Sequence, residues 1–262
     1  MFKKFLITLC LTPTLSWAAD LNDVNTIIER ANNTAFYTAE DGRAVTRMTI
    51  IDSQGRKQLR QFTILRRDIE DGGDQQFLVF FNRPSDIKKT TFLVNKHTGK
   101  DDDRWLYLPG LDLVKRIAAG DNRTSFVGSH FFYEDVSGRD LNADKHELVS
   151  IDDQYYEIKN TPKNPGNVEF SQYTVWIDKV SMMPVKTEYK DKNGVLYRRI
   201  EALKLKTIDG FVTATKMKAT NLRDDSYTIN EMRYIKYNIG IPKNVFNERS
   251  LRTPPREWLK SH

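Results

Sequence analysis

Residues 125–135 carry the side chains of this chain that are best suited to chemistry. Ser129 stands beside His130, which pairs a hydroxyl nucleophile with a base, and Glu134 stands beside Asp135. Neighbouring side chains in an extended chain point to opposite faces, so Ser129 and His130 are poorly placed to share a proton. Catalytic carboxylates generally come from separate elements, and the sequence has no Gly-x-Ser-x-Gly turn. We therefore expect no catalytic residue and a protein that is not an enzyme.

Metal binding finds no better support in the residue pattern. Cys10 is the only cysteine, so a Cys-ligated metal is not expected. The four histidines lack the spacing of known zinc motifs; they are His97, His130, His146 and His262. The run Asp101-Asp102-Asp103 offers oxygen ligands but not the twelve-residue calcium-loop pattern. We expect neither a metal site nor a cofactor.

Large apolar residues dominate the same part of the chain. They fill Trp105–Leu108, continue through 111–117 and return at 126–133, where aromatic residues are dense. Glycines and a proline interrupt these segments, which are therefore unlikely to form one regular element. Apolar residues on irregular, glycine-jointed segments either fill a core or cover a ligand pocket. The residues by themselves leave both interpretations open.

The amino terminus has the layout of a secretory signal peptide. Lys3 and Lys4 precede the apolar residues 5–15, and Ser16-Trp17-Ala18 forms a small-x-small cleavage site. We expect cleavage after Ala18 and a bacterial periplasmic location. A lipoprotein signal at Cys10 is the rival interpretation, and we set it aside because the preceding residue is Leu9 rather than a small one.

Composition restricts the remaining possibilities. The chain has a net charge of +6, and its basic residues are interleaved with acidic ones. This pattern does not indicate nucleic-acid binding, although it allows a weak attraction to anionic lipid headgroups. No segment after the signal is apolar for long enough to cross a bilayer. Without repeats or linker-like stretches, residues 19–262 are interpreted as a single domain.

Hydrophobic periodicity predicts one helix followed by many strands. Capping candidates at 20–23 precede apolar residues at helical spacing up to residue 33. Alternation then predicts strands over residues 43–51, 59–67, 76–81, 90–95, 104–108, 155–160, 169–178, 184–190, 195–206, 211–220 and 226–237. Turn signals such as Asn193-Gly194 and Asp209-Gly210 separate them. Sequential hairpins of this kind build an antiparallel meander.

The later strands carry large apolar groups on both faces. In 169–178, Phe170 and Trp176 share one face, and Tyr173, Val175 and Ile177 share the other. A sheet with one face in water would alternate more cleanly. We therefore expect a cover on both faces, or a sheet curled around an apolar interior. The first helix and residues 111–140 are the available covers, and two packed sheets are the alternative.

Four segments resemble the LolA-like outer-membrane lipoprotein-sorting proteins, in particular the branch associated with RND-type exporters. They are Phe81-x-x-Pro84, then Trp105-Leu106-Tyr107-Leu108-Pro109, then Lys115-Arg116-Ile117, then the Ser-Phe-x-Gly-Ser-x-Phe-x-Tyr-Glu-Asp pattern of 125–135. The likeness extends over residues 20–250 and is sharp over 80–140. It implies an α+β fold in which a curved antiparallel sheet forms an incomplete β-barrel with covering helices.

The same resemblance implies a function and a set of ligand-contacting residues. Members hold acyl chains in the apolar interior, so the aromatic residues become candidates for a cavity lining or lid, with Gly120, Gly128 and Gly138 as joints. By alternation and motif position, the candidates are Phe81, Phe92, Trp105, Tyr107, Leu108, Leu113, Ile117, Phe126, Phe131, Phe132, Tyr133 and Trp176.

We therefore expect a monomeric periplasmic carrier that ferries the acyl chains of a lipid or lipoprotein between the inner and outer membranes. Its expected partners are an RND-type inner-membrane transporter and an outer-membrane acceptor. Two alternatives stay open. One is an adaptor of an envelope or exporter complex that binds no lipid, which a filled core would favour. The other is a lipid hydrolase that uses Ser129 or His130.

Overall fold

Thirteen strands and four short or medium helices make up residues 21–259, which the computed structural model describes. The expected signal peptide at 1–18, with Cys10, lies outside the described residues, as does His262. The strands are β1 (Asp41–Ile51), β2 (Lys57–Asp68), β3 (Gln75–Arg83), β4 (Thr91–Lys96), β5 (Asp103–Leu108), β6 (Leu113–Ile117), β7 (Asp144–Ile151), β8 (Tyr155–Pro162), β9 (Phe170–Asp178), β10 (Pro184–Asp191), β11 (Leu196–Ile208), β12 (Phe211–Asn221) and β13 (Tyr227–Tyr237). The helices are α1 (Val24–Phe36), α2 (Tyr133–Ser137), α3 (Arg249–Arg252) and α4 (Arg256–Leu259).

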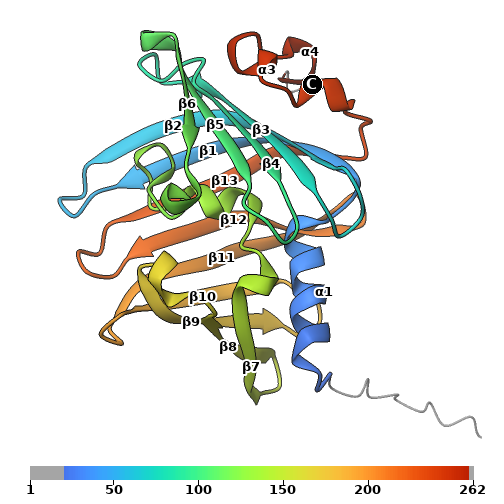
Figure 1. The fold of residues 1–262 in the computed structure, drawn as a ribbon, viewed down its shortest axis with the longest axis vertical. Coiled ribbons are helices and arrows are strands. Elements are labelled where there is room, and N and C mark those ends of the chain that lie inside the picture. Colours follow the sequence, from blue (N-terminus) through green and yellow to red (C-terminus); the bar gives the residue numbers. More distant parts are fainter. Residues whose placement is uncertain (1–20, 260–262) are drawn as a thin grey trace, which may run out of the picture.

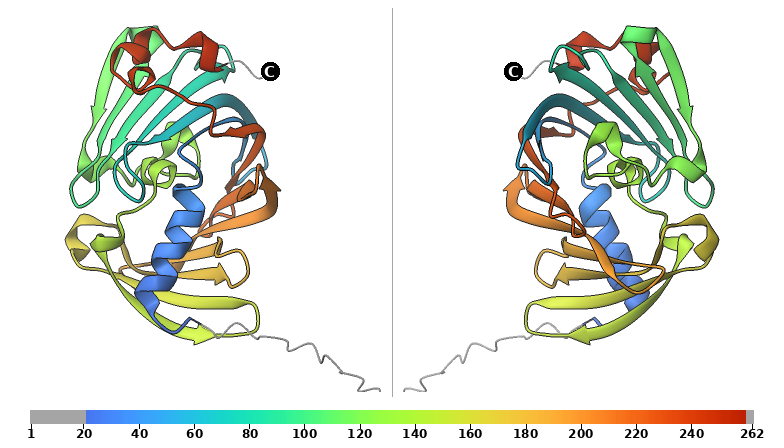
Figure 2. Two further views of the ribbon diagram at one scale, coloured as in Figure 1. Left: turned by 90° about the vertical axis from the view of Figure 1, so that its right-hand side faces the viewer. Right: turned by 90° about the vertical axis from the view of Figure 1, so that its left-hand side faces the viewer.

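All thirteen strands belong to one antiparallel sheet. Strands β1 to β6 form one meander and β7 to β13 form a second, and the pairing of β1 with β13 joins the two. The sheet curls strongly, and its two end strands, β6 and β7, do not pair with each other (Figures 1 and 2). The expected incomplete, curved antiparallel barrel with covering helices is confirmed.

Eleven of the strands follow the predicted alternation, whereas β6 and β7 were not predicted. Residues 113–117, which we expected within the cover, form β6 instead. Both are edge strands with few buried positions. A strand that buries so few residues has no clear alternation of apolar and polar residues, so hydrophobic periodicity does not predict it.

Helix α1 lies on the concave side of the second meander (Figure 2). The Asp23 side chain caps its first turn by accepting a hydrogen bond from the Thr26 backbone N–H at 2.9 Å. Its apolar face buries Ile27, Ile28 and Ala31, and packs against strands β8 and β9. The helix therefore covers the inner face of this half of the sheet.

One segment spans the open side of the barrel. Residues 118–143, here called the crossing segment, connect β6 to β7, which lie at opposite ends of the sheet. The segment contains α2 and the 3-10 helices at Ala119–Asp121, Phe126–Gly128 and Leu141–Ala143. Because its two ends are fixed at the two edges, it must pass across the concave interior, as Figure 1 shows.

Phe126 anchors the crossing segment to the first meander. Its ring is almost fully buried and lies 5.4 Å from the Phe92 ring, 5.5 Å from Tyr133, 5.9 Å from Phe81 and 6.3 Å from Phe62. Apolar side chains from β1 to β6 complete this cluster. Aromatic pairs in this range of separations add to the gain from burial.

The carboxyl-terminal segment covers the opposite, outer face of the first meander. Residues 239–259, which include α3 and α4, pack on Leu65, Leu78 and Leu93 (Figure 2). Trp105 and Tyr107 of β5 join the same cluster. Both faces of this half of the sheet therefore pack against other parts of the chain.

A buried ion network anchors the crossing segment to the second meander. Arg123 donates to Glu134 at 2.6 Å within the segment, and its Nε and Nη2 donate to Glu169, directly before β9, at 2.8–3.0 Å. Burial opposes the charge of Glu169, but the contact with Arg123 outweighs it and lowers the pKa of that carboxyl. Arg123 thus holds two parts of the chain together.

A second set of contacts extends this network. Arg139 pairs with Glu134 at 3.0 Å and donates two hydrogen bonds to Asp144, at 2.8 and 2.9 Å. The Tyr173 hydroxyl donates to the same Asp144 carboxylate at 2.7 Å. The Phe132 ring lies between the guanidinium groups of Arg123 and Arg198, 5.1 and 4.0 Å away.

Replacing Arg123 tests how strongly this network supports the fold. Arg123→Met leaves the buried Glu134 carboxylate and the partly exposed Glu169 carboxylate with fewer partners, and we expect it to lower the free energy of unfolding by about 3 kcal/mol. The matched change Arg56→Met breaks an exposed pair with Asp52 and should cost no more than about 1 kcal/mol. Urea unfolding measures both, and similar small losses would contradict a central role for Arg123.

Gly138 allows the crossing segment to approach helix α1. Its φ is +80°, and a Cβ atom at this position would lie 2.9 Å from the Phe36 ring. We expect Gly138→Ala to destabilise the protein by about 1–3 kcal/mol, because the positive φ strains an alanine backbone and the added Cβ atom is too close to the Phe36 ring. Gly166→Ala, at an open position without a positive φ, should stay within about 0.5 kcal/mol. Equal thermal unfolding midpoints for the two variants would show that the crossing segment does not pack closely on helix α1 at Gly138.

Candidate functional site

A central cavity lies between helix α1, the crossing segment and the concave face of the sheet. Its volume is about 420 Å³, within the range of about 300–1,000 Å³ that is typical of ligand pockets. The wall is formed by α1, β1 to β3, the crossing segment and β7 to β13. The cavity occupies the part of the barrel that neither the helix nor the crossing segment fills.

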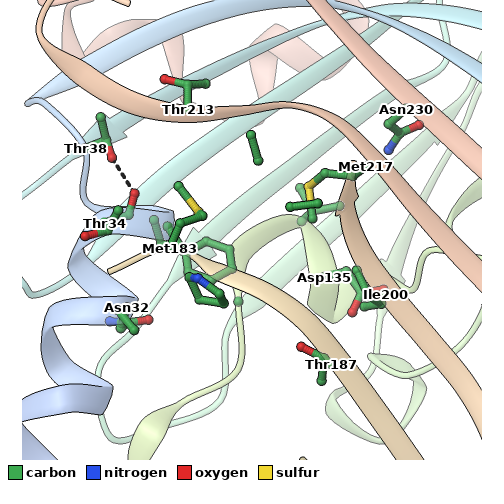
Figure 3. Close-up of a pocket in the computed structure, with 18 of the residues that line it drawn as sticks. Asn32, Thr34, Thr38, Asp135, Met183, Thr187, Ile200, Thr213, Met217 and Asn230 are labelled. Carbon is green, nitrogen blue, oxygen red and sulfur yellow. Dashed lines mark hydrogen bonds between the residues drawn. The ribbon is translucent and has the colours of Figure 1, made fainter. Parts of the chain in front are cut away.

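Small and flexible apolar side chains make up much of the wall. Alanine leaves space that a larger residue would fill, and methionine adapts its shape to an irregular ligand. Figure 3 shows Met183 and Met217 pointing into the same space from opposite sides. The lining residues of these types are Ala31, Ala35, Ala44, Ala202, Ala214, Met183, Met217 and Met232.

The wall also contains polar side chains, and several of them are engaged in hydrogen bonds within the protein. Thr38 donates to the Thr34 carbonyl at 2.7 Å, as drawn in Figure 3. His146 contacts the Asn160 side chain at 2.6 Å. The Asn230 Oδ1 atom is buried, and within residues 21–259 no group donates a hydrogen bond to it. A ligand with a hydrogen-bond donor would satisfy this atom.

Three tyrosines on the wall stay uncharged. Burial raises the pKa of Tyr173, and the nearby Asp144 carboxylate adds to the increase. Burial likewise raises the pKa of Tyr189 and Tyr237. Their rings therefore present neutral surface to the cavity at neutral pH, which suits an apolar ligand.

Ser129 and His130 are occupied by other contacts. The His130 ring nitrogens lie 2.8 Å from the Thr228 hydroxyl and 2.7 Å from the Ser226 hydroxyl, both on or beside β13. The Ser129 hydroxyl instead contacts the Phe131 backbone at 3.2–3.3 Å. Burial lowers the pKa of His130, which keeps its ring neutral. These bonds fix the crossing segment on the sheet.

The structure brings two of the twelve predicted ligand-contacting residues to the cavity wall, Phe126 and Phe131. Four others belong to the core of the first meander, and Leu108 packs against it: the four are Phe81, Phe92, Ile117 and Tyr133. Trp105 and Tyr107 face the carboxyl-terminal segment.

The last three predicted residues lie elsewhere. Leu113 is half-exposed on β6, and Phe132 contacts the two arginines described above. The Trp176 ring has the Lys186 ammonium 3.5 Å from its centre. Ligand contact by any of the twelve residues stays a prediction.

Sequence reasoning did not identify most of the wall. It selected large aromatic residues, whereas alanines and methionines on α1, on β1, directly before β10 and on strands β11 to β13 contribute to the wall. One usable signal was present: Ala31 and Ala35 are one helical turn apart on the face of α1 that meets the sheet.

Two other features were searched for in the part of the chain that the structure describes. Among residues 21–259, no group of three or more His, Asp or Glu side chains is arranged to hold a metal ion. Along the same residues, none of the helices has the length and apolar character needed to cross a membrane.

Comparison with known proteins gives relatives that share this architecture. A DUF1329 family protein from Desulfovibrio piger is 26% identical with a TM-score of 0.79, and the match covers 87% of this chain and 98% of that one. A domain from Vibrio parahaemolyticus, provisionally assigned as outer membrane lipoprotein-sorting, is 26% identical with a TM-score of 0.77, covering 87% and 96%.

A third structure shares the fold at lower identity. A LolA superfamily protein from Nitrosomonas europaea is 16% identical with a TM-score of 0.67, covering 86% of this chain and 98% of that one. No curated protein sequence matches the chain. A family model described as "Uncharacterized protein" matches residues 73–253. Since that model covers more than half of the chain and the solved relatives include DUF1329 and LolA superfamily proteins, this chain belongs to a LolA-like family.

Proposed function

We propose that this protein is a periplasmic carrier that holds the acyl chains of a lipid or lipoprotein in its central cavity and moves them between the inner and outer membranes. The observation that carries the proposal is the apolar cavity of about 420 Å³ beneath the crossing segment. The name of the Vibrio parahaemolyticus relative supports a sorting function. The protein acts without catalysis.

The energetics of extraction explain why such a carrier needs a closed cavity. Each methylene that leaves the bilayer for water costs about 0.8 kcal/mol, so a free acyl chain does not cross an aqueous compartment unaided. A cavity lined by alanine, methionine and aromatic side chains offsets that cost by keeping the chain out of water. Binding therefore requires no nucleotide and no covalent intermediate.

Loading and release then depend on partner proteins. A donor at the inner membrane, for which we propose an RND-type transporter, delivers the lipid, and an outer-membrane acceptor receives it. The crossing segment supports this arrangement because it lies over the cavity and is held by side-chain contacts rather than by strand pairing with the sheet. An acceptor has only to offer the chain an equally apolar site.

The chief alternative is an adaptor that binds an envelope complex and carries no lipid. A filled interior would favour it, and the cavity argues for the carrier. A hydrolase that uses Ser129 is disfavoured, since His130 contacts Thr228 and Ser226. Ser129→Ala and His130→Ala should therefore leave lipid turnover unchanged.

Filling the cavity tests the proposal directly. Ala202 lines the cavity, and its neighbour Leu203 is half-exposed outside it. We expect Ala202→Phe to weaken binding of a dansyl-labelled fatty acid at least tenfold, because the ring occupies the space that the chain needs. Leu203→Phe, one residue away, should bind like the unmodified protein. Fluorescence titration measures both, and an unaffected Ala202→Phe would place the ligand elsewhere.

A further inference from the structure

The ladder between β12 and β13 is interrupted beside the cavity. Pairing joins Lys216–Thr220 to Tyr227–Glu231 and ends there. Along the remaining residues, β12 keeps its pairing with β11, and β13 keeps its pairing with β1. The two strands therefore part within an otherwise continuous sheet. We call the unpaired stretch, residues 211–215 of β12 and 232–237 of β13, the seam.

Irregularities in both neighbouring ladders accompany the seam. The β11–β12 register shifts at Lys204, which is paired with Lys216 at the point where the seam opens. The β1–β13 register shifts so that Tyr234 and Ile235 have no partner on β1, and Tyr234 has a φ of 51°. Bulges bend the strands that contain them, so these two irregularities explain why β12 and β13 separate here.

The seam forms part of the cavity wall. Residues from both of its sides line the cavity: Val212, Thr213, Ala214, Met232, Ile235 and Tyr237. Side chains rather than backbone bonds close its far end, where the Tyr237 hydroxyl lies 2.8 Å from the Thr213 hydroxyl. The Tyr237 ring also packs on Phe211, with 5.3 Å between the ring centres. The backbone ladder therefore does not seal the cavity here.

Basic side chains gather on the outer face along the seam. Asn230, Met232 and Ile235 line the cavity, so Arg233 and Lys236, which alternate with them, point outward. Arg233 is largely exposed, and its guanidinium lies 3.8 Å from the Glu231 carboxylate. Lys236 is exposed as well. Both belong to the bulged strand.

Like charges also stand opposite each other across one flanking ladder. Lys204 is paired in register with Lys216. Like-charged pairs directly opposite each other destabilise a sheet. The Glu231 carboxylate offsets part of this through Lys216, at 3.0 Å. The Lys216 and Arg233 side chains share the Glu231 carboxylate, and an anionic headgroup beside Arg233 and Lys236 would reduce the repulsion among these cations.

We propose that the seam is the headgroup site of the ligand: an amphiphile with an anionic headgroup passes its acyl chain between β12 and β13 into the cavity, and leaves its carboxylate or phosphate on the outer face beside Arg233 and Lys236. This rests on the proposed function, since the chain must occupy the cavity. It adds a ligand class, anionic single-headgroup amphiphiles, and an orientation for the bound molecule.

Charge reversal at the seam tests the headgroup site. Affinities are measured for three ligands with the same acyl chain: a fatty acid, a lysophosphatidic acid and a neutral monoacylglycerol. For Arg233→Glu/Lys236→Glu we expect at least a tenfold loss for the two acidic ligands and less than a twofold change for the neutral one. Arg233→Gln/Lys236→Gln should give a smaller, parallel loss, which added salt reduces.

A control variant with the same charge change shows whether the effect is specific to the seam. Lys57→Glu/Lys163→Glu makes the same charge change at exposed positions away from the seam and should leave all three affinities unchanged. Equal losses for neutral and acidic ligands, or no loss at all, would overturn the headgroup site while leaving the carrier intact. If the unmodified protein bound not even the monoacylglycerol, the proposed function itself would fail. A loss for only one acid identifies the headgroup as carboxylate or phosphate.

Discussion

The strands β6 and β7 follow each other in the chain but lie at opposite ends of the sheet, and the rest of the architecture depends on this constraint. The crossing segment that joins them has to span the open side of the curled sheet. Phe126 fixes it to one meander and Arg123 to the other. These two anchors hold the segment over the interior, and the unfilled space between it, α1 and the sheet is the cavity.

The sequence predicted the elements whose burial is regular. Strands such as β1 and β8 bury alternate residues between good turn signals, and α1 has a capped start and an apolar face. Edge strands escaped prediction because β6, with Lys115 and Arg116, buries little. The early end of the β12–β13 ladder and the bulges in the two ladders beside it were not predicted either, since a bulge depends on how neighbouring strands fit together.

The candidate site shows why a cavity is harder to predict than a core. Large aromatic residues such as Phe81 and Phe92 attracted attention, and they fill space in the first meander. A cavity is bounded by side chains that are too small to fill it, such as Ala202 and Ala214. Small residues are common everywhere, so their pattern becomes informative only when the fold shows which strand faces meet.

Native mass spectrometry of the protein, purified without detergent from the periplasm of its host, tests the central claim most directly. The account predicts a stoichiometric mass excess, and solvent extraction should release an acyl lipid that accounts for it. The acyl chain should also return when the stripped protein is mixed with lipid vesicles. A protein that keeps its unliganded mass in both experiments would contradict the carrier function and would favour an adaptor whose cavity serves no lipid.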